Sequence, residues 1–584
     1  MDKPAPYGEL NAKILHHLNQ IYQDKDKDNE KLTEDIIKIF FKNHRPIIPN
    51  PNETKWNQQD IILITYANSI VEREKIPLQS LQKFLNTYVD DYINSVHILP
   101  YFPYSSDDGF AVIDFKNIND AFGSWEDIET IATKYKLMTD LVINHVSSRS
   151  QWFDQFKSNK NPGQHYFISV EPNTDTSEVT RPRTSPLLQE VETLNGKKLV
   201  WSTFSHDQPD LNFSNPDVLL EVIDITRTYL DHGSKIFRLD AIAFIWKELG
   251  TKCINLPQTH EIIRLIRTLI DFYSDEIYLI TETNIPNREN LSYFGNRNEA
   301  HLVYNFALPP LIIFTLLNGK SEKIKQWLMA MPPAMFGTTY FNFIASHDGI
   351  GLRPVEQILS ISEVDRLASN IEKAGGKISY RSTEGSERPY EMNIALFDAL
   401  KFHVDDNDDG FQEERFIAAH TIMLALEGIP AFYINSLLST ENDYQKLEHS
   451  GHNRAINRHQ WSMDNLIQKL SEDNHHSRIY QELLRLIKLR KEQPAFHPNA
   501  TQFTLNLGND TLALWRQSLD RDQSIFAIHN ISNKEVSIQL SDLNLIETDM
   551  WADLISGNPL SSTHEVLILK AYQSMWITNK SSII

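Results

Sequence analysis

The sequence predicts an α/β protein built on a (β/α)₈ TIM barrel, with long inserted loops, an N-terminal helical extension and an all-β C-terminal domain. Three observations predict it. Short apolar runs alternate with amphipathic helical stretches through the middle of the chain. Two connections are far longer than ordinary barrel loops, and short alternating strands follow from about residue 500. Alternation alone would also suit an open, doubly wound sheet.

The elements follow in chain order. Apolar residues such as Ile14, Leu18 and Ile36 recur at helical spacing within residues 1–55. Eight apolar runs then predict barrel strands at 61–66, 96–101, 137–143, 235–239, 277–280, 303–306, 340–344 and 431–434. We predict an N-terminal extension at 1–55, a barrel at 56–145, 213–351 and 413–499, an inserted domain B at 146–212, a second insertion at 352–412 and a β domain at 500–584.

Composition excludes several classes of function. Lys and Arg number 56 against 77 Asp and Glu, and the net charge of −21 argues against a nucleic-acid partner. A single cysteine, Cys253, excludes an internal disulfide and a cysteine-built metal cage. The N-terminus lacks the pattern of a secretion signal, and prolines interrupt the most apolar stretch, 301–317. We therefore expect a cytoplasmic protein without a membrane partner.

Polar residues cluster where predicted barrel strands end, which is the end at which barrels place their active sites. The segments are 140–145 (DLVINH), 237–241 (FRLDA), 280–284 (ITETN) and 345–351 (ASHDGIG). A single carboxylate there is often only a helix cap or an ion-pair partner. A carboxylate pair, with an arginine two residues before one member, suits acid–base chemistry on a glycosidic bond.

These four segments resemble the signature regions of the α-amylase family of retaining glucoside-active enzymes. Residues 101–110 (YFPYSSDDGF), 201–210 (WSTFSHDQPD) and 453–458 (NRAINR) resemble its sucrose-phosphorylase subgroup. The resemblance implies Asp240 as nucleophile, Glu282 as general acid/base and Asp348 as transition-state stabiliser. It also implies a glucose site formed by Asp107, Phe110, His145, Phe204, Gln208, Arg238, His347 and Arg458.

The charges of the carboxylates fit these implied roles. Arg238 should keep the pKa of Asp240 low. In retaining enzymes the two carboxyl groups are about 5–5.5 Å apart, and a like charge at that distance should raise the pKa of Glu282.

The sucrose-phosphorylase resemblance further implies a phosphate acceptor, because Arg181 and Arg183 resemble its phosphate-contacting loop and Tyr390 its mobile acceptor loop. Three features depart from sucrose phosphorylases: Asn284, Glu391 and a longer loop at 380–388. They resemble the glucosylglycerate phosphorylase branch instead, which implies D-glycerate as acceptor. Its carboxylate needs a cation. The candidates are Arg183, Lys377, Arg381 and Arg388.

The resemblance leaves several acceptors open. Sucrose, sucrose 6′-phosphate and glucosylglycerol phosphorylases are the near alternatives, and an α-glucosidase or a non-catalytic amylase-fold transporter subunit are more distant ones. The expected partners are small molecules: an α-glucoside, inorganic phosphate, glucose 1-phosphate and glycerate. A homodimer stays open.

No cofactor and no metal are expected. The histidine pairs at 16–17 and 475–476 lack a third ligand at metal spacing. The acidic run 405–409 lacks the spacing of a calcium loop.

Overall fold

A closed barrel of eight parallel strands forms the centre of the computed structural model, which describes residues 6–23, 28–50, 54–183, 185–383, 386–403, 408–543 and 545–580. All eight predicted barrel strands are confirmed, in the closed order β1-β15-β11-β10-β9-β8-β4-β3. Their bounds are β1 Ile62–Thr65, β3 Ser95–Ile98, β4 Lys136–Leu141, β8 Ser234–Leu239, β9 Tyr278–Thr281, β10 Leu302–Tyr304, β11 Thr339–Asn342 and β15 Ile429–Tyr433.

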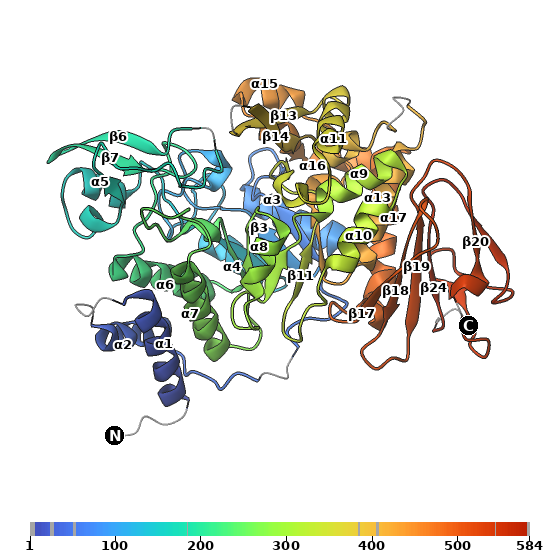
Figure 1. Ribbon diagram of the computed structural model, residues 1–584, viewed down its shortest axis with the longest axis horizontal. Coiled ribbons are helices and arrows are strands. Elements are labelled where there is room, and N and C mark those ends of the chain that lie inside the picture. Colours follow the sequence, from blue (N-terminus) through green and yellow to red (C-terminus); the bar gives the residue numbers. More distant parts are fainter. Residues whose placement is uncertain are drawn as a thin grey trace.

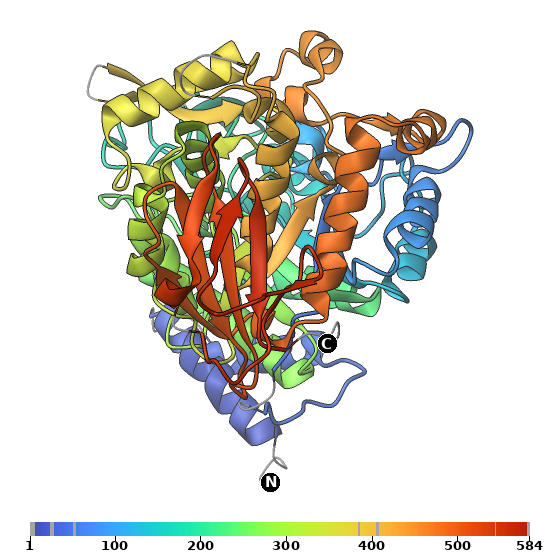
Figure 2. The same cartoon turned by 90° about the vertical axis from the view of Figure 1, so that its right-hand side faces the viewer.

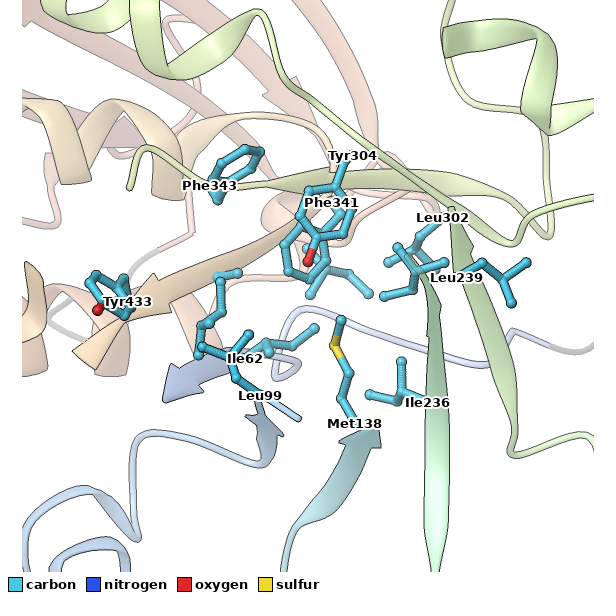
Figure 3. Close-up of a cluster of buried hydrophobic side chains, with 14 of the residues drawn as sticks. Ile62, Leu99, Met138, Ile236, Leu239, Leu302, Tyr304, Phe341, Phe343 and Tyr433 are labelled. Carbon is cyan, nitrogen blue, oxygen red and sulfur yellow. The ribbon is translucent and has the colours of Figure 1, made fainter. Parts of the chain in front are cut away.

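Large apolar side chains fill the barrel interior. Ile62, Met138, Ile236 and Phe341 come from four different strands, point into the same space and are buried (Figure 3). Bulky side chains packed in layers are the normal filling of an eight-stranded barrel. The barrel interior is therefore a packed core that supports the residues at the carboxyl ends of its strands.

The strand register brings polar residues to one end of that core. Asp140 on β4 pairs with Arg238 on β8, and Leu239 pairs with Thr281 on β9. Because neighbouring strands are parallel, Asp240 and Glu282 both emerge directly past the carboxyl ends of adjacent strands. The geometry of a parallel barrel therefore places the two carboxylates side by side.

Helices surround the barrel. The helical stretches that the sequence predicts between the strands include α4 Trp125–Ala132, α6 Pro216–Asp231 and α7 Pro257–Tyr273. Proline occupies the first turn of α6 and α7, where its missing N–H is not needed. The other helices of this region are α3 Pro77–Phe84, α8 Asn287–Leu291, α9 Leu308–Asn318, α10 Glu322–Ala330, α13 Gln412–Ala425, α14 Ile434–Leu437, α15 Tyr444–Ser450, α16 Met463–Ser471 and α17 His475–Lys491.

The N-terminal extension folds into two helices, α1 Tyr7–Ile21 and α2 Asn29–Phe40, which pack on α7 and α6 (Figure 1). The buried positions of α1 recur every three or four residues, as an apolar stripe against a barrel helix requires. His17 contacts Glu261 of α7 at 2.9 Å, and the Tyr22 hydroxyl donates to the Phe213 carbonyl at 3.0 Å. The extension therefore covers the outer wall of the barrel.

Two excursions after barrel strands build small sheets of their own. Residues 146–212 contain α5 Gln151–Lys157 and the sheet β5-β7-β6, with β5 Ser169–Val170, β6 Leu188–Thr193 and β7 Gly196–Trp201. Residues 350–399 contain α11 Ile361–Lys373, α12 Leu396–Ala399 and the sheet β12-β14-β13, with β12 Ile350–Gly351, β13 Lys377–Thr383 and β14 Ser386–Asn393. A short pair, β2 Ile70–Val71 with β16 Trp461–Ser462, joins distant loops.

The C-terminal region is all β, as predicted, and Figure 2 views it face on. It comprises the sheet β17-β18-β19-β24-β21-β22 and the pair β20-β23. The bounds are β17 Thr501–Leu505, β18 Thr511–Gln517, β19 Ser524–Asn530, β20 Val536–Gln539, β21 Ala552–Asp553, β22 Asn558–Pro559, β23 Val566–Leu569 and β24 Ser574–Thr578. The strand β24 lies inside the larger sheet, between β19 and β21, and four of its successive residues are buried.

The most apolar stretch of the chain lies in the core, as expected. It forms β10 and α9, and every residue of α9 except the last is buried. Pro309 and Pro310 occupy the first turn of α9 rather than breaking it. Across the described parts of the chain, we find no helix with the length and apolar character needed to traverse a bilayer.

Candidate active site

Asp240, Glu282 and Asp348 line one pocket at the barrel mouth. Both long excursions contribute to its walls, through Arg183 from the first and Tyr390 from the second. The other sequence-predicted residues that line it are Asp107, Phe110, His145, Phe204, Gln208, Asn284, His347 and Glu391. The pocket therefore joins elements more than 200 residues apart in the sequence.

A single guanidinium connects the first two carboxylates. Arg238 Nη1 donates to Asp240 Oδ1 at 2.7 Å, and Nη2 lies 3.9 Å from Glu282 Oε2. Ala241 adopts the left-handed conformation (φ +47°), and its N–H donates to Glu282 Oε2 at 2.9 Å. A strained residue directly after the predicted nucleophile is typical of active sites. It holds the two carboxyl groups on the same side of the pocket.

Burial changes the acidity of both groups. It raises the pKa of Asp240 although Arg238 lowers it, so the expectation of a low pKa for Asp240 is wrong because desolvation outweighs the ion pair. Burial, opposed by Arg238 and assisted by the charges of Asp240 and Asp348, raises the pKa of Glu282 to about 7. Since only Asp240 directly contacts the guanidinium, Asp240 is the ionised member of the pair and Glu282 carries the proton.

This acidity predicts a pH profile. A general acid with a pKa of about 7 is protonated below that pH and loses its proton above it. We expect kcat/KM for the glucoside substrate to fall about tenfold between about pH 6 and pH 8. In double-displacement kinetics this constant reports only the first half-reaction, so the titration of phosphate does not enter. A profile that stays flat across this range would contradict the assignment.

Asp348 belongs to a second charge cluster. Arg454 Nη1 donates to Asp348, while Nε and Nη2 of the same side chain contact Glu391 at 3.0 and 2.6 Å. Burial would raise the pKa of Asp348, but Arg454 and His347 lower it well below its ordinary value. Asp348 is therefore ionised at neutral pH and presents a fixed negative charge to the pocket.

Aromatic rings form the remaining walls. The rings of Phe110 and His347 stack with centroids 5.1 Å apart and planes 4° apart. His145 Nε2 and Gln208 Nε2 contact the Phe110 carbonyl at 3.0 and 3.2 Å. Burial lowers the pKa of His347 to about 3, so this ring stays neutral. Flat apolar faces with polar edges suit the two faces of a hexose ring.

Two predicted glucose-site arginines lie behind the pocket wall rather than in it. Arg238 sits below the carboxylates, 5.5 Å from the centre of the Tyr304 ring. Arg458 donates to the His347 carbonyl at 2.8 Å and to Asp108 at 2.6 Å. Both therefore position other pocket residues. The pairing of Arg458 with Asp108 leaves its neighbour Asp107 to line the pocket.

Most of the cations that were predicted to bind the acceptor lie outside the pocket. Arg183 lines the pocket and donates to the Tyr390 hydroxyl at 3.1 Å. Arg181 is exposed and outside it. Arg381 pairs with Glu356. Lys377 and Arg388, on the β13–β14 hairpin, are not pocket residues either. The hairpin thus contributes Tyr390 and Glu391 but not its cations.

Sequence reasoning missed two pocket arginines. Arg454 lies in the 453–458 motif, yet only Arg458 was given a role there. Arg353 follows the β12 strand and lines the pocket, as Asn284 does. Its signal was its position two residues after the 345–351 segment, since residues that follow a barrel strand tend to reach the mouth.

The metal expectation needs one amendment. Glu441 lies beside His475 and His476, and one ligand atom of each residue lies within 4.8 Å of the others, so a third ligand is present after all. Zn²⁺ with bonds of about 2.1 Å spaces its ligands about 3.4 Å apart. The ligand atoms of this group can therefore be farther apart than those of a zinc site, and Glu441 is also exposed. Residues 405–407 of the acidic run lie outside the described residues.

Comparisons with known proteins place the chain in a family. Residues 87–353 match the family described as Alpha amylase, catalytic domain. The chain is 39% identical to the glucosylglycerate phosphorylase of Allomeiothermus silvanus (97% of this chain, 99% of that one) and 38% identical to that of Spirochaeta thermophila (94% and 95%). The crystal structure of sucrose 6F-phosphate phosphorylase from Thermoanaerobacter thermosaccharolyticum has the same fold, with a TM-score of 0.71 at 24% identity, covering 88% of this chain and 98% of that one.

The chain therefore belongs to the α-amylase family. Its relatives at 37–39% identity are glucosylglycerate phosphorylases.

Proposed function

We propose that this chain is a retaining glycoside phosphorylase that reversibly converts 2-O-α-D-glucosyl-D-glycerate and phosphate to α-D-glucose 1-phosphate and D-glycerate. The observation that carries the proposal is the composition of one pocket: Asp240, Glu282 and Asp348 together with Arg183 and Arg353. The carboxylates suit a double displacement at the anomeric carbon. The two arginines suit reactants that are both anions. Similarity over nearly the whole chain to glucosylglycerate phosphorylases supports glycerate as the acceptor.

In the first step Asp240 attacks the anomeric carbon, and the bond to the glycerate oxygen breaks. Glu282 gives its proton to that oxygen, so glycerate leaves as an alcohol. The product is a β-glucosyl ester of Asp240. Charge that develops on the sugar ring is stabilised by Asp348, which Arg454 keeps ionised.

In the second step phosphate takes the place of glycerate. A phosphate oxygen attacks the anomeric carbon from the face that glycerate left, and the Asp240 ester bond breaks. The hydrogen-phosphate proton returns to Glu282, which restores the enzyme and gives α-glucose 1-phosphate. Arg183, oriented by Tyr390, is the cation that we assign to phosphate.

A second candidate within this class is a phosphorylase with another acceptor. Relatives at 29% and 28% identity carry the names glucosylglycerol phosphorylase and sucrose 6(F)-phosphate phosphorylase. The same carboxylates would serve them, so the acceptor depends on the outer pocket. Asn284 and Glu391, which depart from the sucrose-phosphorylase pattern and resemble the glucosylglycerate phosphorylase branch, both line this pocket and support glycerate over fructose.

Release of inorganic phosphate from glucose 1-phosphate tests the proposal. We expect fast release with D-glycerate and at least tenfold lower kcat/KM with fructose, fructose 6-phosphate or glycerol. Fast release with fructose and none with glycerate would overturn the acceptor. Glucose release from glucosylglycerate that does not depend on phosphate would indicate an α-glucosidase.

Two further properties belong to the proposal. A charged sugar-phosphate product and the presence of one cysteine suit the cytoplasm, where phosphate is abundant and thiols are reduced. A homodimer stays a prediction, which sedimentation velocity would test.

A further inference from the structure

Arg353 is a pocket arginine whose charge is not balanced by an ion pair with any described carboxylate. It opens the short helical turn Arg353–Val355, two residues past β12, and lines the same pocket as Glu282 and Asp348. Its Nε is buried and has no hydrogen-bond partner in the described structure. A buried guanidinium N–H without an acceptor is unfavourable, so the site favours an anionic ligand.

The other two arginines that line the pocket are already engaged. Arg454 uses three nitrogens on Asp348 and Glu391. Arg183 donates to the Tyr390 hydroxyl and lies over the Phe204 ring. Arg353 therefore differs from both, because its charge is not used to hold a protein carboxylate or an aromatic wall.

Asn284 lies against the chain segment that carries Arg353. A Cβ atom on Gly351 would lie 2.6 Å from Asn284 Nδ2, so only the absence of a side chain at Gly351 allows this contact. Asn284 Oδ1 is buried and has no partner in the described structure. The close approach places Asn284, whose Nδ2 can donate to a carboxylate, against the segment that carries Arg353, and both residues line the pocket that contains Glu282.

We infer that Arg353 and Asn284 form the subsite for the carboxylate of the glycerate acceptor. This inference rests on the proposed function and names the cation that it requires. In glucosylglycerate the carboxylate is bonded to the carbon that carries the glycosidic oxygen. When Glu282 protonates that oxygen, the carboxylate must lie next to Glu282, and Asn284 follows Glu282 by two residues. The cationic side chains of the β13–β14 hairpin do not line the pocket that contains Glu282.

The full-length Arg353→Met variant tests the subsite in the direction of glucoside synthesis. The acceptors are D-glycerate and glycerol, which differ only in the carboxylate. We expect kcat/KM for glycerate to fall about 100-fold, as loss of a charged hydrogen bond predicts, while kcat/KM for glycerol changes less than threefold. The matched control is Arg366→Met, which removes an exposed arginine from α11 and should change neither.

Each result has a defined meaning. An equal fall in kcat/KM for both acceptors would show a structural role and overturn the subsite. A change confined to the KM for phosphate, measured in phosphorolysis, would also overturn it. Unchanged use of glycerate by the variant would overturn the subsite but leave the proposed function intact. A wild-type enzyme that transfers glucose to other acceptors but not to glycerate would overturn both. If the Met variant does not fold, Arg353→Gln and Arg353→Lys replace it, and only Lys should retain part of the preference for glycerate.

Discussion

Asp240→Asn is expected to lower kcat for phosphorolysis on the order of 10⁵-fold, or about 7 kcal/mol in the activation barrier. An amide cannot form the glucosyl ester, and no other described carboxylate contacts Arg238 Nη1 from the pocket side, since Asp140 holds it from below. Steady-state assays with glucosylglycerate and with α-glucosyl fluoride should show equal losses. The second substrate has a good leaving group, so its failure to react identifies the missing nucleophile.

Two controls separate chemistry from folding in this variant. Asn has nearly the same volume as Asp, so the melting temperature should stay within a few degrees of wild type. Asp224→Asn removes a carboxylate from α6 that forms an exposed ion pair with Lys116, and it should retain full activity. An Asp240→Asn enzyme with more than a hundredth of wild-type turnover would mean that another group attacks the sugar.

Glu282→Gln is expected to lower kcat for phosphorolysis of glucosylglycerate about 10⁴-fold, the upper end for general acid catalysis, because glycerate is a poor leaving group without a proton. Glucosyl fluoride needs no protonation, so its consumption should fall far less. Without phosphate, the variant should accumulate the glucosyl ester of Asp240, visible by intact-protein mass spectrometry as one added sugar unit. Phosphate, already an anionic nucleophile, should discharge it.

The pH profile provides an independent check on Glu282. The fall in kcat/KM near pH 7 arises because burial raises the pKa of this one carboxyl group. The Glu282→Gln variant should show no fall near pH 7 in kcat/KM for glucosyl fluoride. Equal losses with both donors, or a pH profile unchanged by the mutation, would assign the acid role to another residue.

The barrel was predictable from the sequence because each of its eight strands is a short apolar run followed by a polar group. Asp240 and Glu282 emerge from adjacent parallel strands, so strand order alone fixed them as neighbours. The neighbours of the inner strand β24 were not predictable, because the strand order of its sheet does not follow the sequence. Its place is set by pairing with β19, a long-range contact that composition does not encode.

The acceptor side of the site was less predictable. Cations were expected on the hairpin that carries Tyr390, because that loop contains three of them near each other in sequence. In a β-hairpin, side chains alternate between faces, and only some can reach the pocket. Arg381 turns to Glu356 instead. The pKa of Asp240 was also misjudged, because the extent of burial at a strand end is a tertiary property.

Arg454 links two functions of the pocket. One side chain holds Asp348, which lines the pocket, and Glu391 of β14. If Glu391 moved away, more of the guanidinium nitrogens could donate to Asp348. A sugar that hydrogen-bonds to Asp348 would in turn weaken the contact between Arg454 and Glu391. Thermodynamic linkage makes such an effect reciprocal. Occupancy of the pocket at Asp348 and the contacts of Glu391 should therefore respond to each other.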